Sequence, residues 1–124
     1  MTASQPEPPS PNPLPEGEGA TGADPVILKR FRAALDLAYG DRIERVLLYG
    51  SRARGDAGLE SDYDVAVFIR DHRGSWEENL LLAEVTTDIL LDTGALIEAI
   101  PFPEGAYRER TGFMREVRKD GLDL

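Results

Sequence analysis

The segment that most constrains this chain is a glycine-rich loop that ends in two aspartates at the edge of an apolar run. Residues 49–70 read YGSRARGDAGLESDYDVAVFIR, and Asp62 and Asp64 directly precede the apolar run 65–69. Side chains at positions i and i+2 of a strand point to the same face, so the two carboxylates lie side by side and repel each other. A hard divalent cation such as Mg²⁺, which takes carboxylate, phosphate and water oxygens as ligands, relieves that repulsion. The alternative interpretation is that both aspartates are solvated turn residues that end the loop.

Boundary signals and apolar runs before this loop predict a helix and then a strand. Asp24 is an N-cap residue followed by a proline at the first helical position, and apolar residues then recur at helical spacing until Gly40. These signals predict a helix over 25–39. Residues 43–49 are a short apolar run that ends at a glycine, and residues 65–69 are a second run rich in β-branched and aromatic side chains. We expect both runs to be buried strands.

The second half of the chain predicts another helix, a third strand and a last helix. Ser75 and Glu78 have the spacing of a capping box, which predicts a helix over 76–92. The apolar face expected for this helix comprises Trp76, Leu80, Ala83, Thr87 and Leu90. Residues 95–100 form a further apolar run that stops at prolines, and an amphipathic stretch lies before Gly121. The resulting order of helix, strand, strand, helix, strand and helix predicts an α/β fold with a small mixed sheet of about three strands flanked by helices.

Composition separates a tail from a folded domain and excludes some classes of function. Residues 1–24 hold six of the nine prolines and four acidic residues, so we expect a disordered, proline-rich acidic tail followed by one domain over 25–124. The chain has 14 basic and 23 acidic residues, a net charge of −9, which argues against general nucleic-acid binding. It has no apolar run long enough for a membrane span, no apolar secretory leader and no cysteine, so we expect a cytoplasmic protein.

The glycine-rich loop itself is suited to an anion. Gly50 and Ser51 come directly after a predicted strand, where glycine permits close backbone approach and free N–H groups can cradle a phosphate. Arg52 and Arg54 follow within one turn. The loop is not a P-loop, because it lacks the lysine followed by serine or threonine that ends that motif.

Together these residues spell GS, ten intervening residues and then DxD, with a predicted strand on either side. This arrangement resembles the nucleotidyltransferase domains of the polymerase-β superfamily. With GSRARG and SDYD in so short a chain, it looks more narrowly like the minimal nucleotidyltransferases, which in prokaryotes are often paired with a HEPN-domain protein and can act as its antitoxin. The resemblance covers roughly residues 26–100 and implies the nucleotidyltransferase fold.

The resemblance also implies a role for each residue of the motif. Gly50 and Ser51 would hold the β- and γ-phosphates of ATP or another NTP, and Arg54 would help to neutralise the triphosphate. Asp62 and Asp64 would bind Mg²⁺, the implied cofactor. The implied reaction is the transfer of AMP from ATP to a protein partner, such as a HEPN-type toxin, with loss of pyrophosphate.

A third carboxylate commonly completes the metal site in active members of such a family, and Glu98 is the only acidic residue inside the third predicted strand. Its alternation partners Leu96 and Ile100 are apolar, so Glu98 either shares the metal-facing side as a catalytic residue and metal ligand or lies unpaired on a buried face, which would be costly. The remaining alternative is that Glu98 is a partly exposed residue near a sheet edge. The family usually has aspartate here. The alternative function is therefore a catalytically weak nucleotidyltransferase-fold subunit that acts by binding a HEPN partner. Transfer to a small molecule is disfavoured, because such enzymes usually have an extra helical domain for the acceptor.

Overall fold

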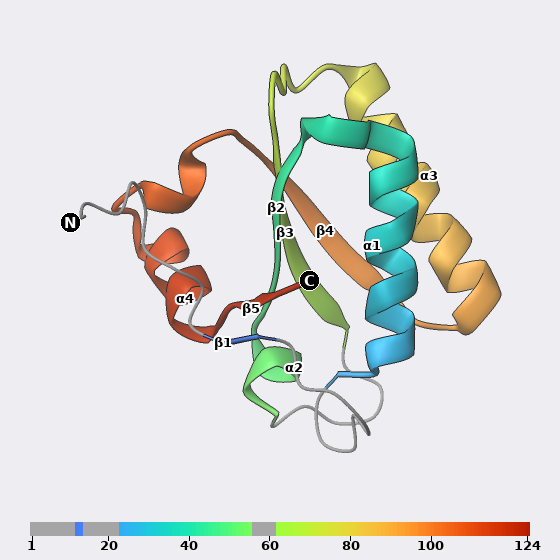
Figure 1. Ribbon diagram of the computed structural model, residues 1–124, viewed down its shortest axis with the longest axis horizontal. Coiled ribbons are helices and arrows are strands. Elements are labelled where there is room, and N and C mark those ends of the chain that lie inside the picture. The colour runs from blue at the N-terminus through green and yellow to red at the C-terminus, as the bar shows by residue number, and fades with distance from the viewer. Residues whose placement is uncertain (1–11, 14–22, 56–61) are drawn as a thin grey trace.

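The computed structural model describes residues 12–13, 23–55 and 62–124, and these residues form a sheet with helices on both faces (Figure 1). Helices α1 and α3 lie on one side of the sheet and α4 lies on the other. The elements are, in chain order, β1 (Asn12–Pro13), α1 (Pro25–Tyr39), η1 (Gly40–Arg42), β2 (Ile43–Tyr49), α2 (Ser51–Arg54), β3 (Tyr63–Ile69), α3 (Trp76–Thr93), β4 (Ile97–Pro103), η2 (Ala106–Arg108), α4 (Gly112–Asp120) and β5 (Leu122–Asp123). The predicted α/β class and the predicted order of the six main elements are confirmed.

The sheet is mixed, with strand order β1-β5-β2-β3-β4. Strand β2 pairs antiparallel with both β3 and β5, whereas β3 pairs in parallel with β4. Parallel neighbours need a crossover connection, and α3 provides it between β3 and β4. The three long strands are those predicted from the sequence. Strands β1 and β5 have two residues each and pair in parallel with each other, and runs that short have no periodicity from which to predict them.

Two apolar clusters lie on opposite faces of the sheet. Alternate residues of β3 point to opposite faces, so Val65, Val67 and Ile69 pack with α1 and α3. Ala66 and Phe68 instead pack in the second cluster, with residues of η2 and α4. Asp64 has the same parity as Ala66 and Phe68 and therefore faces the α4 side.

The first residues of α1 and α3 form the predicted N-cap hydrogen bonds, but the Glu78 carboxylate accepts from the Arg73 and Gly74 N–H groups and so does not complete the predicted capping box. The Asp24 carboxylate accepts a hydrogen bond of 2.9 Å from the Val26 N–H, and the Ser75 hydroxyl accepts one of 3.2 Å from the Glu78 N–H. Helix α1 has the predicted bounds, and α3 ends one residue later than predicted. No helix in the described ranges is long and apolar enough to cross a membrane. Most of the expected tail over 1–24 lies outside the described residues.

Strand bounds differ from the expectation at two places. Strand β3 begins two residues earlier, at Tyr63, so Asp64 lies inside the strand. Strand β4 covers Ile97–Pro103 rather than 95–100, so Pro101 lies within the strand and Pro103 is its last residue. Because β4 is the edge strand of the sheet, a proline there removes no interior ladder bond.

The predicted apolar face of α3 is wrong. Leu82, Val85 and Ile89 are its buried residues, whereas Trp76 is 71% exposed and Leu80 is 42% exposed. The helix contains apolar side chains on most of its circumference, so spacing alone does not select the face that packs on the sheet.

Candidate active site

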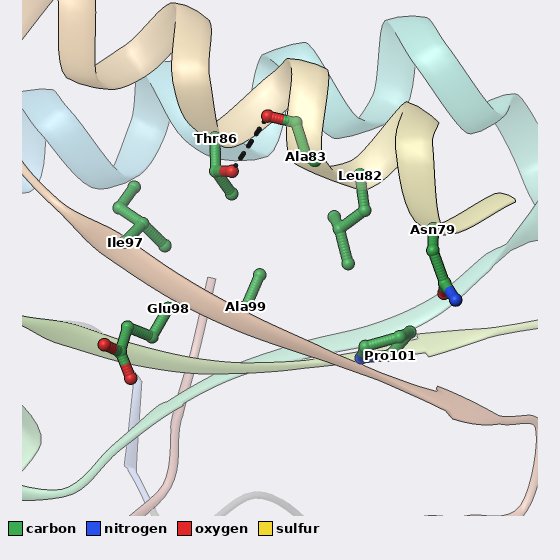
Figure 2. Close-up of a pocket in the computed structure, with 8 residues that line it drawn as sticks. All are labelled: Asn79, Leu82, Ala83, Thr86, Ile97, Glu98, Ala99 and Pro101. Carbon is green, nitrogen blue, oxygen red and sulfur yellow. Dashed lines mark hydrogen bonds between the residues drawn. The ribbon is translucent and has the colours of Figure 1, made fainter. Parts of the chain in front are cut away.

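The register of the sheet brings the predicted carboxylates together. Strands β3 and β4 are parallel with Asp64 opposite Glu98, so the two side chains lie on the same face, and Asp62 directly precedes β3. A groove with a volume of about 350 Å³ lies between α3 and β4. Figure 2 shows that the Glu98 carboxylate points away from α3, on the other side of β4. Glu98 is exposed, and Asp62 and Asp64 are half-buried. Glu98 therefore meets two of the descriptions left open by the sequence: it shares the face of Asp64 and it lies on an edge strand.

The pKa values of Glu98 and Asp64 are perturbed by their acidic neighbours. A hydrogen bond with Asp62, followed by the Asp62 charge, burial and the Asp64 charge, raises the pKa of Glu98. Burial and then the Asp62 charge raise the pKa of Asp64. Both shifts disfavour the ionised form, as expected where like charges are held close together. A bound cation would remove this penalty.

Gly50 lies directly against Asp64. Its φ is 80° and its ψ is −158°, and a Cβ atom at this position would lie 2.7 Å from Oδ2 of Asp64. Tyr49, the residue before it, is the register partner of Asp64 in the antiparallel pair β2–β3. The glycine thus allows the backbone to turn beside the carboxylate, and Ser51 begins α2 at the same point.

Arg54, predicted to contact the triphosphate, is engaged with the end of α4. Its Nη1 atom lies 2.9 Å from Oδ2 of Asp120, whose side chain is only 9% exposed. This ion pair joins α2 to α4, two elements far apart in the sequence. A role of Arg54 in phosphate binding stays a prediction.

Two residues at the site, Tyr63 and Tyr49, were not identified as site residues from the sequence. Arg52 lies over the Tyr63 ring, 4.2 Å from its centroid, and donates a hydrogen bond of 3.3 Å to the Tyr63 hydroxyl. That hydroxyl also accepts from the Asp24 N–H at 3.2 Å. Because Tyr63 lies between the two aspartates of the DxD motif, these contacts attach the loop and the start of α1 to the site. The strand predicted over 65–69 did not include Tyr63, and nothing in the sequence paired this tyrosine with Arg52.

Tyr49 is the other such residue. Burial, followed by the charges of Asp64 and Glu98, raises the pKa of Tyr49 to about 12. Its hydroxyl therefore stays protonated near neutral pH and can donate a hydrogen bond at the edge of the site. The Tyr49 ring packs against Phe113 of α4, with centroids 5.4 Å apart.

The three carboxylates are suitable ligands for a divalent cation, but they do not form a complete metal-binding site by themselves. Asp62, Asp64 and Glu98 provide only oxygen ligands and an excess of negative charge, which suits Mg²⁺. Within residues 12–13, 23–55 and 62–124, no three acidic or histidine side chains form a ready-made metal-binding group. Mg²⁺ commonly keeps several waters and uses substrate phosphates as ligands, so one or two carboxylates from the protein suffice.

The site combines a mixed sheet, a glycine turn that packs against one carboxylate, and acidic side chains that share one face of the sheet. This combination is typical of enzymes that transfer nucleotidyl groups. Comparison with known proteins agrees with this class. The family model described as "Polymerase beta, Nucleotidyltransferase" matches residues 36–120. The chain belongs to this family and is a nucleotidyltransferase-like enzyme.

Relatives and solved structures add to this assignment. "Putative protein adenylyltransferase MJ0604" of Methanocaldococcus jannaschii is 32% identical over 99 residues, which cover 78% of this chain and 93% of that protein. "Putative protein adenylyltransferase MJ0141" of the same organism is 29% identical over 98 residues, covering 79% and 95%. The crystal structure of "a putative nucleotidyltransferase" from Sulfolobus solfataricus has the same fold, with a TM-score of 0.55, 19% identity and 87% of each chain covered.

Proposed function

We propose that this protein uses Mg²⁺ to transfer AMP from ATP to a protein partner, and that the partner is a HEPN-type toxin for which this chain is the antitoxin. The observation that supports catalysis is the register of β3 and β4, which places Glu98 opposite Asp64 on one face of the sheet, with Asp62 directly before β3. The choice of AMP and of a protein acceptor rests on the two relatives, whose names describe protein adenylyltransferases. The HEPN partner rests on the resemblance of the motif to minimal nucleotidyltransferases.

The proposed roles follow from where the side chains lie. Asp62, Asp64 and Glu98 would hold Mg²⁺, which when bound neutralises triphosphate charge and stabilises the attacking and leaving oxygens. Gly50 and Ser51 would orient the phosphates beside Asp64. The acceptor oxygen forms a bond to the α-phosphorus while the bond between the α-phosphorus and the bridging oxygen breaks, and pyrophosphate leaves. Glu98, the most exposed of the three carboxylates, is the group placed to receive the proton of the acceptor hydroxyl.

The test is label transfer to the partner. A purified HEPN-domain protein, as the proposed partner, would be incubated with ATP labelled at the α-phosphate, Mg²⁺ and the wild-type protein or Glu98→Gln. We expect labelled partner with the wild type and a loss of roughly 10²–10³-fold with the variant, because removing a charge that stabilises the transition state costs on the order of 3 kcal/mol. Glu104→Gln, directly after the other end of β4, is the matched control and should transfer normally.

Two outcomes would contradict the proposal in different ways. Equal transfer by wild type and Glu98→Gln would remove Glu98 from the catalytic set. A partner that binds tightly but is never labelled would favour the alternative, a catalytically weak subunit that acts by binding.

A further inference from the structure

Four arginines line a cavity on the α4 side of the molecule. Arg108 ends η2, Arg110 lies in the following loop, and Arg115 and Arg118 lie on α4. The cavity has a volume of about 450 Å³. Such a concentration of positive charge is unexpected in a chain with a net charge of −9.

This cavity is separate from the carboxylate site. Phe113 contacts Tyr49 and Asp120 pairs with Arg54, so both mark the side of α4 that faces the candidate active site. At about 100° per helical residue, positions 115 and 118 project from roughly the opposite side of the helix. The four arginines are therefore not the triphosphate-binding groups of the proposed reaction.

The cavity is partly preorganised. Nη1 of Arg118 donates to the Tyr107 carbonyl at 2.5 Å and to the Glu109 carbonyl at 2.8 Å, which fixes the loop that forms one wall. Both bonds use one nitrogen, so the other guanidinium nitrogens remain available to a ligand. Among the residues that the structure describes, neither Arg110 nor Arg115 forms an ion pair. The four guanidinium groups concentrate positive charge around one cavity, and this favours an anionic ligand there.

We propose that this arginine cavity is a second binding site, and that its ligand is a small soluble compound with two or more phosphate groups. Guanidinium groups bind phosphate oxygens through paired hydrogen bonds, and several guanidinium groups suit a compound with more than one phosphate. The volume lies within the range of about 300–1,000 Å³ found for small-molecule sites. A nucleic acid is disfavoured, because acidic Glu109 and Glu116 adjoin the arginines and the whole chain is negative, so a long polyanion would be repelled beyond the cavity.

The test is titration of the full chain with inorganic pyrophosphate in EDTA and low salt, followed by calorimetry. EDTA prevents metal-dependent binding at the carboxylates. We expect wild type and the double variant Asp62→Asn, Asp64→Asn to bind pyrophosphate alike. The double variant Arg110→Gln, Arg115→Gln should bind it at least tenfold more weakly. Both arginines are exposed, so these substitutions leave the fold intact.

The matched control is Lys29→Gln, Lys119→Gln, which removes the same charge from exposed positions outside the cavity lining. An equal loss in this control would show only a general charge effect and would overturn the site. Loss of binding in the aspartate variant would place pyrophosphate at the carboxylate site and overturn it as well. Tighter arginine-dependent binding of a short single-stranded RNA than of pyrophosphate would overturn the small-ligand class. None of these outcomes depends on nucleotidyl transfer, so the proposed function stands or falls separately.

Discussion

Replacement of Gly50 by alanine should damage both stability and nucleotide binding. Gly50 adopts φ 80° and ψ −158°, a conformation that is nearly restricted to glycine, so a side chain there costs on the order of 1–3 kcal/mol. For a domain of this size, each kcal/mol lowers the melting temperature by about 4–8 °C. The added Cβ would also lie 2.7 Å from Oδ2 of Asp64, so the Asp64 carboxylate must move. We therefore expect the shift in melting temperature produced by ATP and Mg²⁺ to be lost.

Gly40→Ala separates these two effects. Gly40 also has a positive φ, with φ 62° and ψ −137°, but a Cβ atom there would meet no atom within 4 Å. It should show a comparable loss of stability and keep the full ATP and Mg²⁺ shift, which reports binding to the folded state by mass action. The assay is differential scanning fluorimetry of wild type and both variants, with and without ATP and Mg²⁺. A normal nucleotide shift in Gly50→Ala would refute the argument that Gly50 keeps Asp64 in place for binding.

Two further predictions concern charge. The double variant Asp62→Asn, Asp64→Asn should show no ATP and Mg²⁺ shift in melting temperature, as should wild type in EDTA; a shift equal to that of wild type would exclude these residues as metal ligands. The pKa of Glu78 is lowered below its usual 4.5, first by a hydrogen bond from the backbone N–H of Arg73 and then by the Arg42 guanidinium. Ionised Glu78 therefore stabilises the fold above about pH 4.5, and this contribution is lost as the pH falls through the lowered pKa of Glu78 in the folded protein. Glu78→Gln should therefore be less stable than wild type at pH 7, and urea unfolding should show this difference shrink in acid, whereas exposed Glu77→Gln should show no such trend.

The parts of the fold that were predictable from sequence depend on local chemistry. Helix α1 and strand β2 have the predicted bounds, because Asp24 and Gly40 delimit the helix and a glycine follows the strand. The bounds of β4 were not predictable in the same way. Whether Pro101 ends a strand depends on whether that strand lies at an edge, and this is a property of the whole sheet.

The same distinction applies to the candidate site. The pairs Gly50 with Ser51 and Asp62 with Asp64 are each close in sequence, so a motif could identify them. Glu98 reaches the same face only through the register of β3 and β4, and a shift of one residue would turn it to the other face. The ion pair of Arg54 with Asp120 joins residues 66 positions apart, and no local pattern predicts it.

Strand β3 contributes both to the apolar core and to the candidate site. Val65 and Val67 are fully buried against α1 and α3. Asp64, the second residue of β3, faces the opposite side of the sheet. Because a strand alternates its side chains, burial of the valines fixes the direction of Asp64 without any contact to the carboxylate itself. The large apolar core thus holds Asp64 close to two like charges, an arrangement that the carboxylates alone would not maintain. This is why a cation, rather than relaxation of the strand, is the expected means of relieving their repulsion.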